Sequence, residues 1–397
     1  MNVILFDGES RQKLLPLTYT RPVGNLRVGI LTINEKWEKA LKAPVSYATE
    51  DYLSTKFPMK KGMDNILING GLCPDGRIEL AIQNLNPGES LKKEGKTLAV
   101  RLDPDELESY LKGKELSCFV GKEYTDEILL IEHSWDIFAK NGDALDFDFK
   151  VITDGRKSQP LSDTNTLIGD QIFIEEGATV EGAIINTTSG PVYIGKDAEV
   201  MEGALIRGGL ALCEHAGLKM GAKIYGPTTI GPHSKAGGEV SNSIIYGYSN
   251  KGHDGFIGNT VIGEWCNLGA DTNTSNLKNN YAKVRLWSYE TQRFADTGLQ
   301  FCGLIMGDHS KCGINTMFNT GTVVGVSSNI YGAGFPRNYI PSFAWGGAGG
   351  MMEFRYSKAA EVAQAMMARR GLEFDAVEDG IVKHVFEATA NLRRNLK

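Results

Sequence analysis

The chain has little of what marks secreted, metal-binding or nucleic-acid-binding proteins. Its six cysteines form no Cys-x-x-Cys pair and follow no metal-ligand spacing, so we expect reduced, structural thiols. The formal net charge is −6, and no basic stripe suits a nucleic-acid backbone. No stretch is apolar for long enough to span a bilayer, and the first residues lack the features of a secretory signal. These absences predict a cytoplasmic protein that binds neither nucleic acid nor membrane.

Glycine, by contrast, is abundant. The sequence holds 47 glycines in 397 residues, which exceeds the usual share of about 7%. Because 42% of the residues are apolar, the chain is neither disordered nor collagen-like. A regular structure must therefore use glycine repeatedly. The length also favours two domains, since one hydrophobic core usually stops growing before this size.

Apolar side chains recur every six residues in the C-terminal half of the chain. The repeated positions are Ile168, Ile174, Val180, Ile194, Val200, Ile206, Ile224, Ile230, Ala236, Ile262, Leu268, Met306, Cys312, Phe318, Val324 and Ile330. Glycine often follows, as in Ile230-Gly231, where a small residue lets the backbone turn a corner. Three hexapeptides close one triangular coil, and stacked coils bury an apolar column. The repeat predicts an all-β, left-handed parallel β-helix over residues 161–335, a fold that most often serves transferases.

Two segments interrupt or follow the repeat. Between about residues 275 and 304 the period disappears, which predicts a loop inserted into one coil, and such loops commonly carry binding groups. Residues 336–397 combine a Pro- and Gly-rich loop with two helical patterns. We expect this helical tail to pack rather than to carry chemistry.

Residues 1–160 alternate short apolar runs with helical patterns. Strands that alternate with helices predict an α/β, Rossmann-like domain with a mononucleotide site at a strand end. The first strand leads into a loop that holds Gly8 and several cations, where phosphate is the expected guest.

This layout resembles the sugar-1-phosphate nucleotidyltransferases, in particular the bifunctional N-acetylglucosamine-1-phosphate uridyltransferase/glucosamine-1-phosphate acetyltransferases (GlmU). The domain order is the same, Gly8 and Arg11 correspond to the opening signature of the family, and Arg21-Pro22 stands where the family has Lys-Pro. The resemblance implies that these residues bind nucleotide phosphates. The family's strand-end Gly-Asp, whose aspartate holds Mg²⁺, is replaced by Asn-Gly-Gly at 69–71. Either Asp75 or another carboxylate holds the metal, or nucleotidyl transfer has been lost.

Residues 251–276 resemble the acetyltransferase site of the same family. The resemblance places His253 at the catalytic histidine, Ala270 at the backbone N–H that meets the thioester carbonyl, and Asn276 at a substrate-contacting asparagine. Histidine suits the reaction because an amino sugar attacks a thioester only when a base that titrates near neutral pH accepts its proton. A backbone N–H stabilises the developing oxyanion.

The family also supplies two cations to the sugar phosphate, whereas residues 236–250 contain none. Five residues are candidates to replace them: Lys223, Lys235, Lys251, Lys283 and Arg285. A solvated surface charge is the alternative interpretation of each.

The leading hypothesis is an enzyme that acetylates an amino-sugar 1-phosphate with acetyl-CoA and transfers a nucleotidyl group to it with Mg²⁺, giving UDP-N-acetylglucosamine or a similar product. The resemblance implies a sugar phosphate, a nucleoside triphosphate and acyl-CoA as small-molecule partners. It also implies a homotrimer, because the family binds acyl-CoA between neighbouring β-helices.

Three alternatives use other parts of the pattern. The chain could transfer nucleotidyl groups alone, for example thymidylyl or uridylyl to glucose 1-phosphate, with the β-helix as an oligomerisation arm. It could also be a non-catalytic scaffold that binds nucleotide sugars. Hexapeptide β-helices host zinc carbonic anhydrases as well, but the spacing of His215, His233, His253 and His309 does not reproduce that ligand set.

Overall fold

The computed structural model describes residues 2–394 and residue 396, and the chain forms two compact units. The first contains the residues up to 14, 21–27 and 31–133, and the second contains 15–20, 28–30 and the residues from 134 on. None of the helices in this described part is long and apolar enough to cross a membrane.

A six-stranded mixed sheet organises the first unit. Its strand order is β2 (Val45–Ala48), β1 (Asn2–Phe6), β3 (Asn65–Asn69), β6 (Lys96–Leu102), β5 (Glu89–Lys93) and β7 (Val120–Glu123). Strand β1 pairs in parallel with β2 and β3, whereas β6 runs antiparallel to β3 and β5. The predicted α/β domain is confirmed, and the antiparallel β6 makes its sheet mixed.

Two helices of this unit begin where their sequences signal a start. Thr32 and Glu35 form a capping box at α2 (Ile33–Leu41), and Asp103 and Glu106 form another at α4 (Pro104–Leu111). Such boxes bond backbone N–H groups that the first turn leaves without partners. Strands β1 and β3 are buried along nearly their whole length, as expected for strands covered on both faces.

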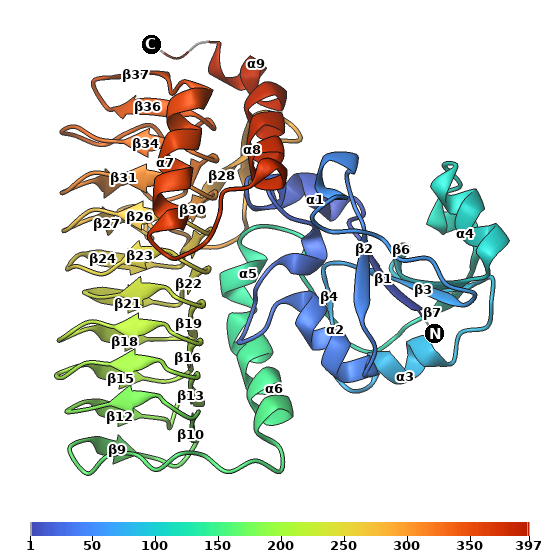
Figure 1. Cartoon of the computed structure of the whole chain (residues 1–397), viewed down its shortest axis with the longest axis horizontal. Helices are drawn as coiled ribbons and strands as arrows, with labels where there is room; N and C mark the ends of the chain where they lie inside the picture. Colours follow the sequence, from blue (N-terminus) through green and yellow to red (C-terminus); the bar gives the residue numbers. More distant parts are fainter. Residues whose placement is uncertain (1, 395, 397) are drawn as a thin grey trace. The chain divides into compact units, whose positions relative to one another are not determined.

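Parallel strands of the second unit stack into a three-sided β-helix, whose successive coils Figure 1 shows from β9 to β36. The first sheet contains β10 (Ile172–Ile174), β13 (Val192–Ile194), β16 (Leu210–Leu212), β19 (Thr228–Ile230), β22 (Ile244–Ile245), β25 (Val261–Ile262), β30 (Leu304–Met306), β33 (Thr322–Val324) and β35 (Tyr339–Ile340). The second contains β11 (Thr179–Val180), β14 (Glu199–Val200), β17 (Gly217–Leu218), β20 (Lys235–Ala236), β23 (Asn250–Lys251), β26 (Asn267–Leu268), β31 (Lys311–Cys312), β34 (Asn329–Ile330), β36 (Ala344–Gly347) and β37 (Gly350–Glu353). The third contains β9 (Thr166–Ile168), β12 (Ile184–Asn186), β15 (Leu205–Arg207), β18 (Lys223–Tyr225), β21 (Glu239–Ser241) and β24 (Phe256–Gly258), and β27 (Asn273–Thr274) pairs with β32 (Met317–Phe318). The predicted parallel β-helix is confirmed.

The six-residue repeat supplies the interior of the β-helix. Every predicted inward residue except Ile168 is buried in one hydrophobic cluster. Ile168 is 45% exposed, because β9 is the edge strand and its Leu167, not Ile168, pairs with the inward Ile185. The prediction for Ile168 was therefore wrong by one residue of register.

Four-residue corners join the first sheet to the second. The third corner residue has positive φ at Asp197, His215, His233, Tyr248, Trp265, His309, Ser327 and Phe343. Five consecutive rings of this series, from His215 to His309, stack with centroids 4.3–6.3 Å apart. Glycine at the first corner position serves a different purpose: a Cβ on Gly231 would lie 2.7 Å from the backbone of the next coil. It permits close stacking of coils rather than positive φ.

The inserted segment and the tail complete the second unit. Residues 275–304 hold an antiparallel hairpin of β28 (Arg285–Ser288) and β29 (Arg293–Asp296) before β30 rejoins the first sheet. Strands of the β-helix continue past residue 335 to β37, followed by α7 (Tyr356–Ala368), α8 (Ala376–Ala388) and α9 (Ala390–Arg393).

Helices α5 (Asp136–Ala139) and α6 (Asn141–Thr153) also belong to the second unit, although the sequence predicted a boundary near residue 160. Asn141 explains this, because its Nδ2 donates to the carbonyl of Pro227 and its Oδ1 accepts from Gly29 N–H.

Candidate functional site

A shortened corner creates a hollow on the β-helix. The corners that join the second sheet to the third hold four residues at 219–222 and 252–255, but only Gly237 and Gly238 join β20 to β21 between them. Strand β21 nevertheless pairs in register with β18 and β24 on its two sides. The two missing residues therefore leave a gap between the neighbouring corners without disturbing the sheet.

This gap is a hollow of about 470 Å³. Its lining residues are Lys219, Met220, Gly238, Gly252, His253, Asp254, Ala270 and Asp271. The structure thus brings together two residues that the sequence singled out, His253 and Ala270. They hold the second position of adjacent corners, and Met220 holds the same position across the gap.

His253 presents its side chain to solvent, since the residue is exposed. Its ring makes no hydrogen bond or ion pair within the described chain, whereas its backbone carbonyl accepts a hydrogen bond from Lys251. The corner is also fixed to the next coil, because Asp271 N–H donates to the carbonyl of Asp254. A free imidazole on an anchored backbone can act as a base toward a molecule in the hollow.

The backbone of Ala270 offers a hydrogen-bond donor at the same hollow. Its carbonyl accepts from Asn315 N–H at 2.8 Å, but its own N–H donates to no group in the part of the chain that the structure describes. An unpaired N–H beside a solvent-open hollow is available to a ligand carbonyl.

Lys219 is a residue that the sequence analysis missed. It is the only cation among the described residues that line the hollow. Lys235 lies on β20, and burial, followed by the nearby charge of Lys219, lowers its pKa. The two lysines are therefore neighbours beside the shortened corner. The sequence alone gave no signal for Lys219, because the short corner beside it becomes apparent only from the paired strands.

Lys251 is turned away from the hollow. Although it sits in β23 next to this corner, it is 1% exposed and belongs to the inward row. Its Nζ donates to the carbonyls of Gly237, His253 and Asp254. Burial lowers the pKa of this ammonium to about 8. Because the ammonium faces the interior, Lys251 cannot contact a sugar phosphate, and this expectation is corrected.

The other candidates for substrate contact lie elsewhere. Asn276 Nδ2 donates to Asn259 Oδ1 at 2.9 Å, at the opposite end of β24 from His253. Lys283 is exposed on the inserted segment, and Arg285 Nε lies 3.6 Å from a carboxylate oxygen of Asp296. None of the three lines the hollow within one chain.

In the first unit, two hollows flank the loop after β1. One, of about 440 Å³, is lined by residues that include Gly8, Lys13, Asn69, Lys96 and Glu132. The other, of about 580 Å³, is lined by residues that include Gly8 and Arg11. Gly8 has φ +57°, so it gives the loop a turn that favours glycine. Lys13 has no ion-pair partner among the residues described, whereas Lys96 pairs with Glu132.

The two arginines of the predicted signature are buried. Arg11 Nη1 lies 2.7 Å from Asp7 Oδ2, and its Nη2 donates to the hydroxyl of Tyr52. Burial raises the pKa of Asp7, and the guanidinium of Arg11 opposes this rise. Arg21 is 5% exposed. Arg11 therefore organises the loop through its ion pair rather than presenting a free charge.

The sequence offered Asp75 as a metal ligand, but its carboxylate is already in use. Asp75 Oδ1 accepts from the N–H groups of Arg77 and Ile78 at the start of α3 (Ile78–Gln83), and Oδ2 contacts the Arg77 guanidinium. No cluster of three or more His, Cys, Asp or Glu side chains suited to a metal occurs in the described chain. The glycine that replaces the family aspartate has a steric reason, since a Cβ on Gly71 would lie 2.2 Å from the carbonyl oxygen of Ile131. Asp75 does not fit Mg²⁺.

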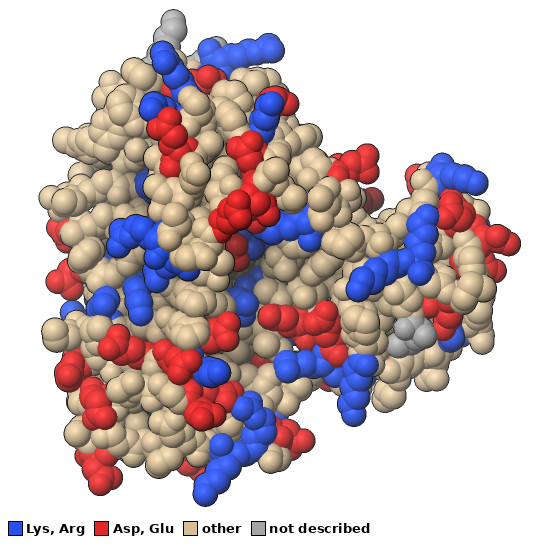
Figure 2. Space-filling view, viewed as in Figure 1, with Lys and Arg blue, Asp and Glu red and all other residues tan. Residues whose placement is uncertain are grey.

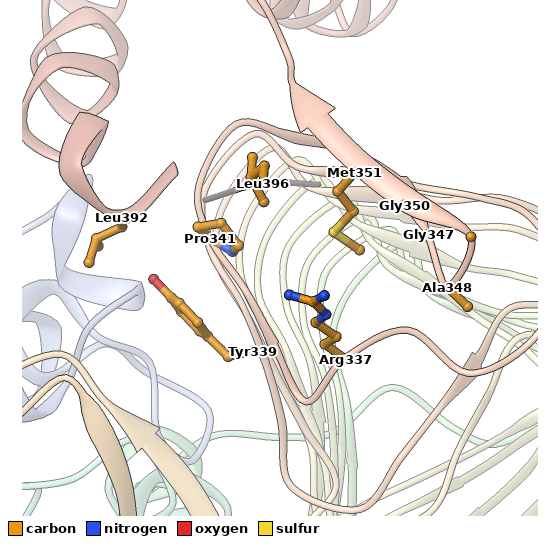
Figure 3. A pocket seen from close by; sticks show the side chains of 10 residues that line it. Arg337, Tyr339, Pro341, Gly347, Ala348, Gly350, Met351, Leu392 and Leu396 are labelled. Carbon is orange, nitrogen blue, oxygen red and sulfur yellow. The ribbon is translucent and has the colours of Figure 1, made fainter. Parts of the chain in front are cut away.

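None of the candidate residues lines a further pocket at the C-terminal end of the β-helix. A pocket of about 230 Å³ at the last coils of the β-helix is lined by Arg337, Tyr339, Met351 and several glycines, and Figure 3 shows these side chains around it. On the face drawn in Figure 2, Lys and Arg side chains are interspersed with Asp and Glu.

Residues 3–157 match a protein family described as sugar nucleotidyl transferase. The bifunctional protein GlmU of Methanococcus maripaludis is 26% identical over 274 residues, which are 69% of this chain and 57% of that protein. The GlmU of Methanocaldococcus jannaschii is 36% identical over 22% of this chain and 21% of its own length. The bifunctional sugar-1-phosphate nucleotidylyltransferase/acetyltransferase of Sulfurisphaera tokodaii is 28% identical over 36% and 35% of the two chains. The chain thus spans less than two thirds of each of these relatives.

Solved structures match part of the chain at low identity. The UDP-N-acetylglucosamine acyltransferase of Francisella novicida is 13% identical, with a TM-score of 0.29, over 60% of this chain and 90% of its own. The resemblance predicted from the sequence is confirmed by the matches in sequence.

Proposed function

We propose that this GlmU-like chain is a transferase of sugar-nucleotide biosynthesis. Its β-helix acetylates the amino group of an amino-sugar 1-phosphate with acetyl-CoA, and its N-terminal unit transfers a nucleotidyl group to the sugar 1-phosphate, giving UDP-N-acetylglucosamine or a similar product. One observation carries the proposal: an exposed His253 and the unpaired N–H of Ala270 line the same hollow.

The residues divide the acetyl transfer between them. The amino nitrogen attacks the thioester carbonyl carbon while the imidazole of His253 accepts its proton. Negative charge develops on the carbonyl oxygen, and the N–H of Ala270 stabilises it. The C–S bond then breaks, the acetyl group stays on nitrogen, and the CoA thiolate leaves and takes up a proton. Lys219 and Lys235 supply positive charge beside the hollow for the sugar phosphate.

Nucleotidyl transfer is assigned to the hollows around Gly8. The nucleoside triphosphate would meet the Gly8 loop and the unpaired Lys13, and the sugar phosphate oxygen would displace pyrophosphate. Mg²⁺ normally neutralises the phosphates in such reactions, and Asp75 is not its ligand here. The carboxylate of Asp75 already accepts hydrogen bonds, and position 71 holds a glycine. Both observations favour a second candidate, an acetyltransferase whose N-terminal unit binds nucleotides without transferring them.

One coupled experiment separates these functions. The protein is incubated with acetyl-CoA, glucosamine 1-phosphate, UTP and Mg²⁺, and release of CoA thiol and of pyrophosphate is followed separately. We expect thiol release that depends on the amino sugar. Pyrophosphate release in addition supports the bifunctional enzyme, and its absence supports the second candidate. Pyrophosphate without thiol indicates a nucleotidyltransferase with a β-helical arm, and neither product indicates a binding scaffold.

The assembly and the location are part of the same proposal. We expect a cytoplasmic homotrimer in which a neighbouring β-helix completes the acyl-CoA site, because the hollow seen in one chain is open to solvent. Light scattering that gives a monomeric mass would exclude this assembly.

A further inference from the structure

The interior of the β-helix contains a charged side chain. In the second sheet the inward row runs through Leu218, Ala236, Lys251, Leu268 and Cys312. Lys251 is among the largest fully buried side chains of the molecule. Taking an ammonium out of water is strongly unfavourable unless hydrogen bonds replace the lost solvation. A lysine in this row is therefore expected only where nearby groups can accept hydrogen bonds from its ammonium.

The shortened corner and the His253 corner differ from ordinary corners in their last residue. Ordinary corners end on an inward alanine, such as the fully buried Ala204 and Ala222, but the short corner and the His253 corner end on Gly238 and Gly255. Both glycines have positive φ, and a Cβ would lie 2.7 Å from a backbone oxygen of the next coil at Gly238 and 2.2 Å from one at Gly255, so neither corner contributes an inward methyl group. The long side chain of Lys251 occupies the same level, one coil above Ala236.

The ammonium bonds one carbonyl of the short corner and two carbonyls of the His253 corner beside it. Nζ lies 2.6 Å from the oxygen of His253, 3.1 Å from that of Asp254 and 3.2 Å from that of Gly237. An ammonium has three N–H donors, so each donor has one acceptor. Lys251 makes no ion pair with a carboxylate in the described part of the chain, and all three acceptors are neutral backbone groups.

Two of these acceptors set the position of the imidazole. The carbonyl of His253 belongs to the peptide plane between His253 and Asp254, and the carbonyl of Asp254 belongs to the next plane. Fixing both planes restricts the backbone on the C-terminal side of His253, and hence the direction in which its side chain leaves the backbone. Lys251 therefore holds the corner from inside while the imidazole stands outside in the hollow.

We propose that Lys251 is a positioning residue for acetyl transfer, which orients His253 by bonding the carbonyls of residues 253 and 254 from the core of the β-helix. This inference rests on the proposed acetyltransferase function. It also explains why a lysine adjacent to the site does not contact the substrate. The loss of solvation that lowers the pKa of Lys251 to about 8 agrees with this buried position.

The test compares the buried Lys251 with Lys311, a half-buried lysine of the same sheet. Lys251→Met keeps a long apolar side chain but removes all three donors. Lys311→Met is the matched control, because Lys311 Nζ donates to the carbonyl of His309 in its own coil and its pKa is likewise lowered to about 8 by burial. Both variants lose an ammonium whose pKa is lowered by loss of solvation, and only the first loses the hydrogen bonds to the carbonyls of His253 and Asp254.

We expect Lys251→Met to lower kcat for CoA-thiol release about 100-fold, the loss that follows a displacement of about 1 Å in a reacting group. KM for acetyl-CoA should stay within about twofold, and Lys311→Met should keep kcat. Lys251→Gln, whose amide retains two N–H donors, should recover part of the lost rate. Near-ultraviolet circular dichroism checks that each variant is folded.

Two results would overturn the inference: an unchanged kcat in Lys251→Met, or equal losses in Lys251→Met and Lys311→Met. If Lys251→Met does not fold, Lys251→Gln decides, because its kcat must lie clearly below that of the unaltered protein while Lys311→Met remains active. Absence of thiol release in the unaltered protein is a different result, and it would contradict the proposed function instead.

Discussion

The Nζ atom of Lys251 lies 2.6 Å from the carbonyl oxygen of His253. A buried charge and an exposed imidazole thus share one corner of the β-helix, the inner group bonding the backbone and the outer one facing the hollow. The position of the imidazole in the hollow therefore depends on a hydrogen bond made inside the β-helix.

Replacing His253 by alanine should abolish CoA-thiol release with little change in stability. The residue is exposed, so its loss removes a base and no packing. A positioned general base typically contributes about 10²- to 10⁴-fold to the rate. His215→Ala is the control, because His215 stacks on His233 at a different corner. Normal acetylation by His253→Ala would remove the central residue of the mechanism.

Replacing Ala270 by proline should remove the oxyanion donor while keeping the corner. Proline has no N–H, and the chain already places Pro232 between Gly231 and the positive-φ His233, as Ala270 stands between Gly269 and the positive-φ Asp271. We expect kcat to fall about 10²- to 10³-fold, the usual effect of losing one such donor. Ala270→Ser keeps the N–H and should remain active. Equal activity of the two variants would exclude the assigned role.

Inserting two alanines between Gly237 and Gly238 should fill the hollow. The insertion restores a corner of the ordinary length of four residues, and strand register on either side does not depend on corner length. Thiol release should disappear while pyrophosphate release, if present, continues. The same insertion in the corner at 201–204 serves as a control and should leave both reactions intact.

Above pH 8, stability should depend on Lys251 and Lys311. Burial lowers the pKa of Lys251 and of Lys311 from 10.5 to about 8. Between these values the unfolded chain binds protons that the folded chain does not, so these groups raise the free energy of unfolding as pH increases. Below about pH 8 both states are protonated and the contribution is constant.

Buried thiols act in the opposite direction, since burial raises the pKa of Cys266. The measurement is therefore a difference: the free energy of unfolding in urea is compared between the unaltered protein and Lys251→Met from pH 7.5 to 9.5. The free energy of unfolding of the unaltered protein should rise relative to that of the methionine variant as pH increases above about 8. A pH-independent difference would contradict the buried charge.

Replacing Arg11 by methionine should destabilise the first unit rather than only weaken nucleotide binding. The change leaves the carboxylate of Asp7, already raised in pKa by burial, without its ion-pair partner. Breaking a buried pair on one side typically costs about 3–5 kcal/mol. Lys13→Met is the comparison, since it should weaken UTP binding and keep the unfolding midpoint. An unchanged midpoint in Arg11→Met would show that the pair contributes little.

The sequence predicted the β-helix because its column is a local pattern. A period of six survives insertion of the hairpin at 275–304, since each coil needs only its own inward residues. The same pattern concealed the site. The period was followed to Ala236 and resumed at Ile262, and the short corner lies within that gap, where the inward residue is a lysine.

His253 could be chosen from the sequence, since its glycine-rich surroundings match a known motif. The environment of Arg11 could not, because its partners Thr49 and Tyr52 come from segments about 40 residues away. The burial of Lys251 could not be predicted from the sequence either, because it depends on a corner length that only the paired strands reveal.

A shortened corner can create a hollow on the surface without changing the rest of the β-helix. In most folds, losing two residues moves everything that follows. Here the pairing of strands, rather than the length of the corners, aligns each coil with the next. The loss of two residues therefore changes only one corner. A regular β-helix can therefore acquire a hollow of ligand size when one corner is two residues shorter than its neighbours. A lysine then occupies one position of the otherwise apolar inward row.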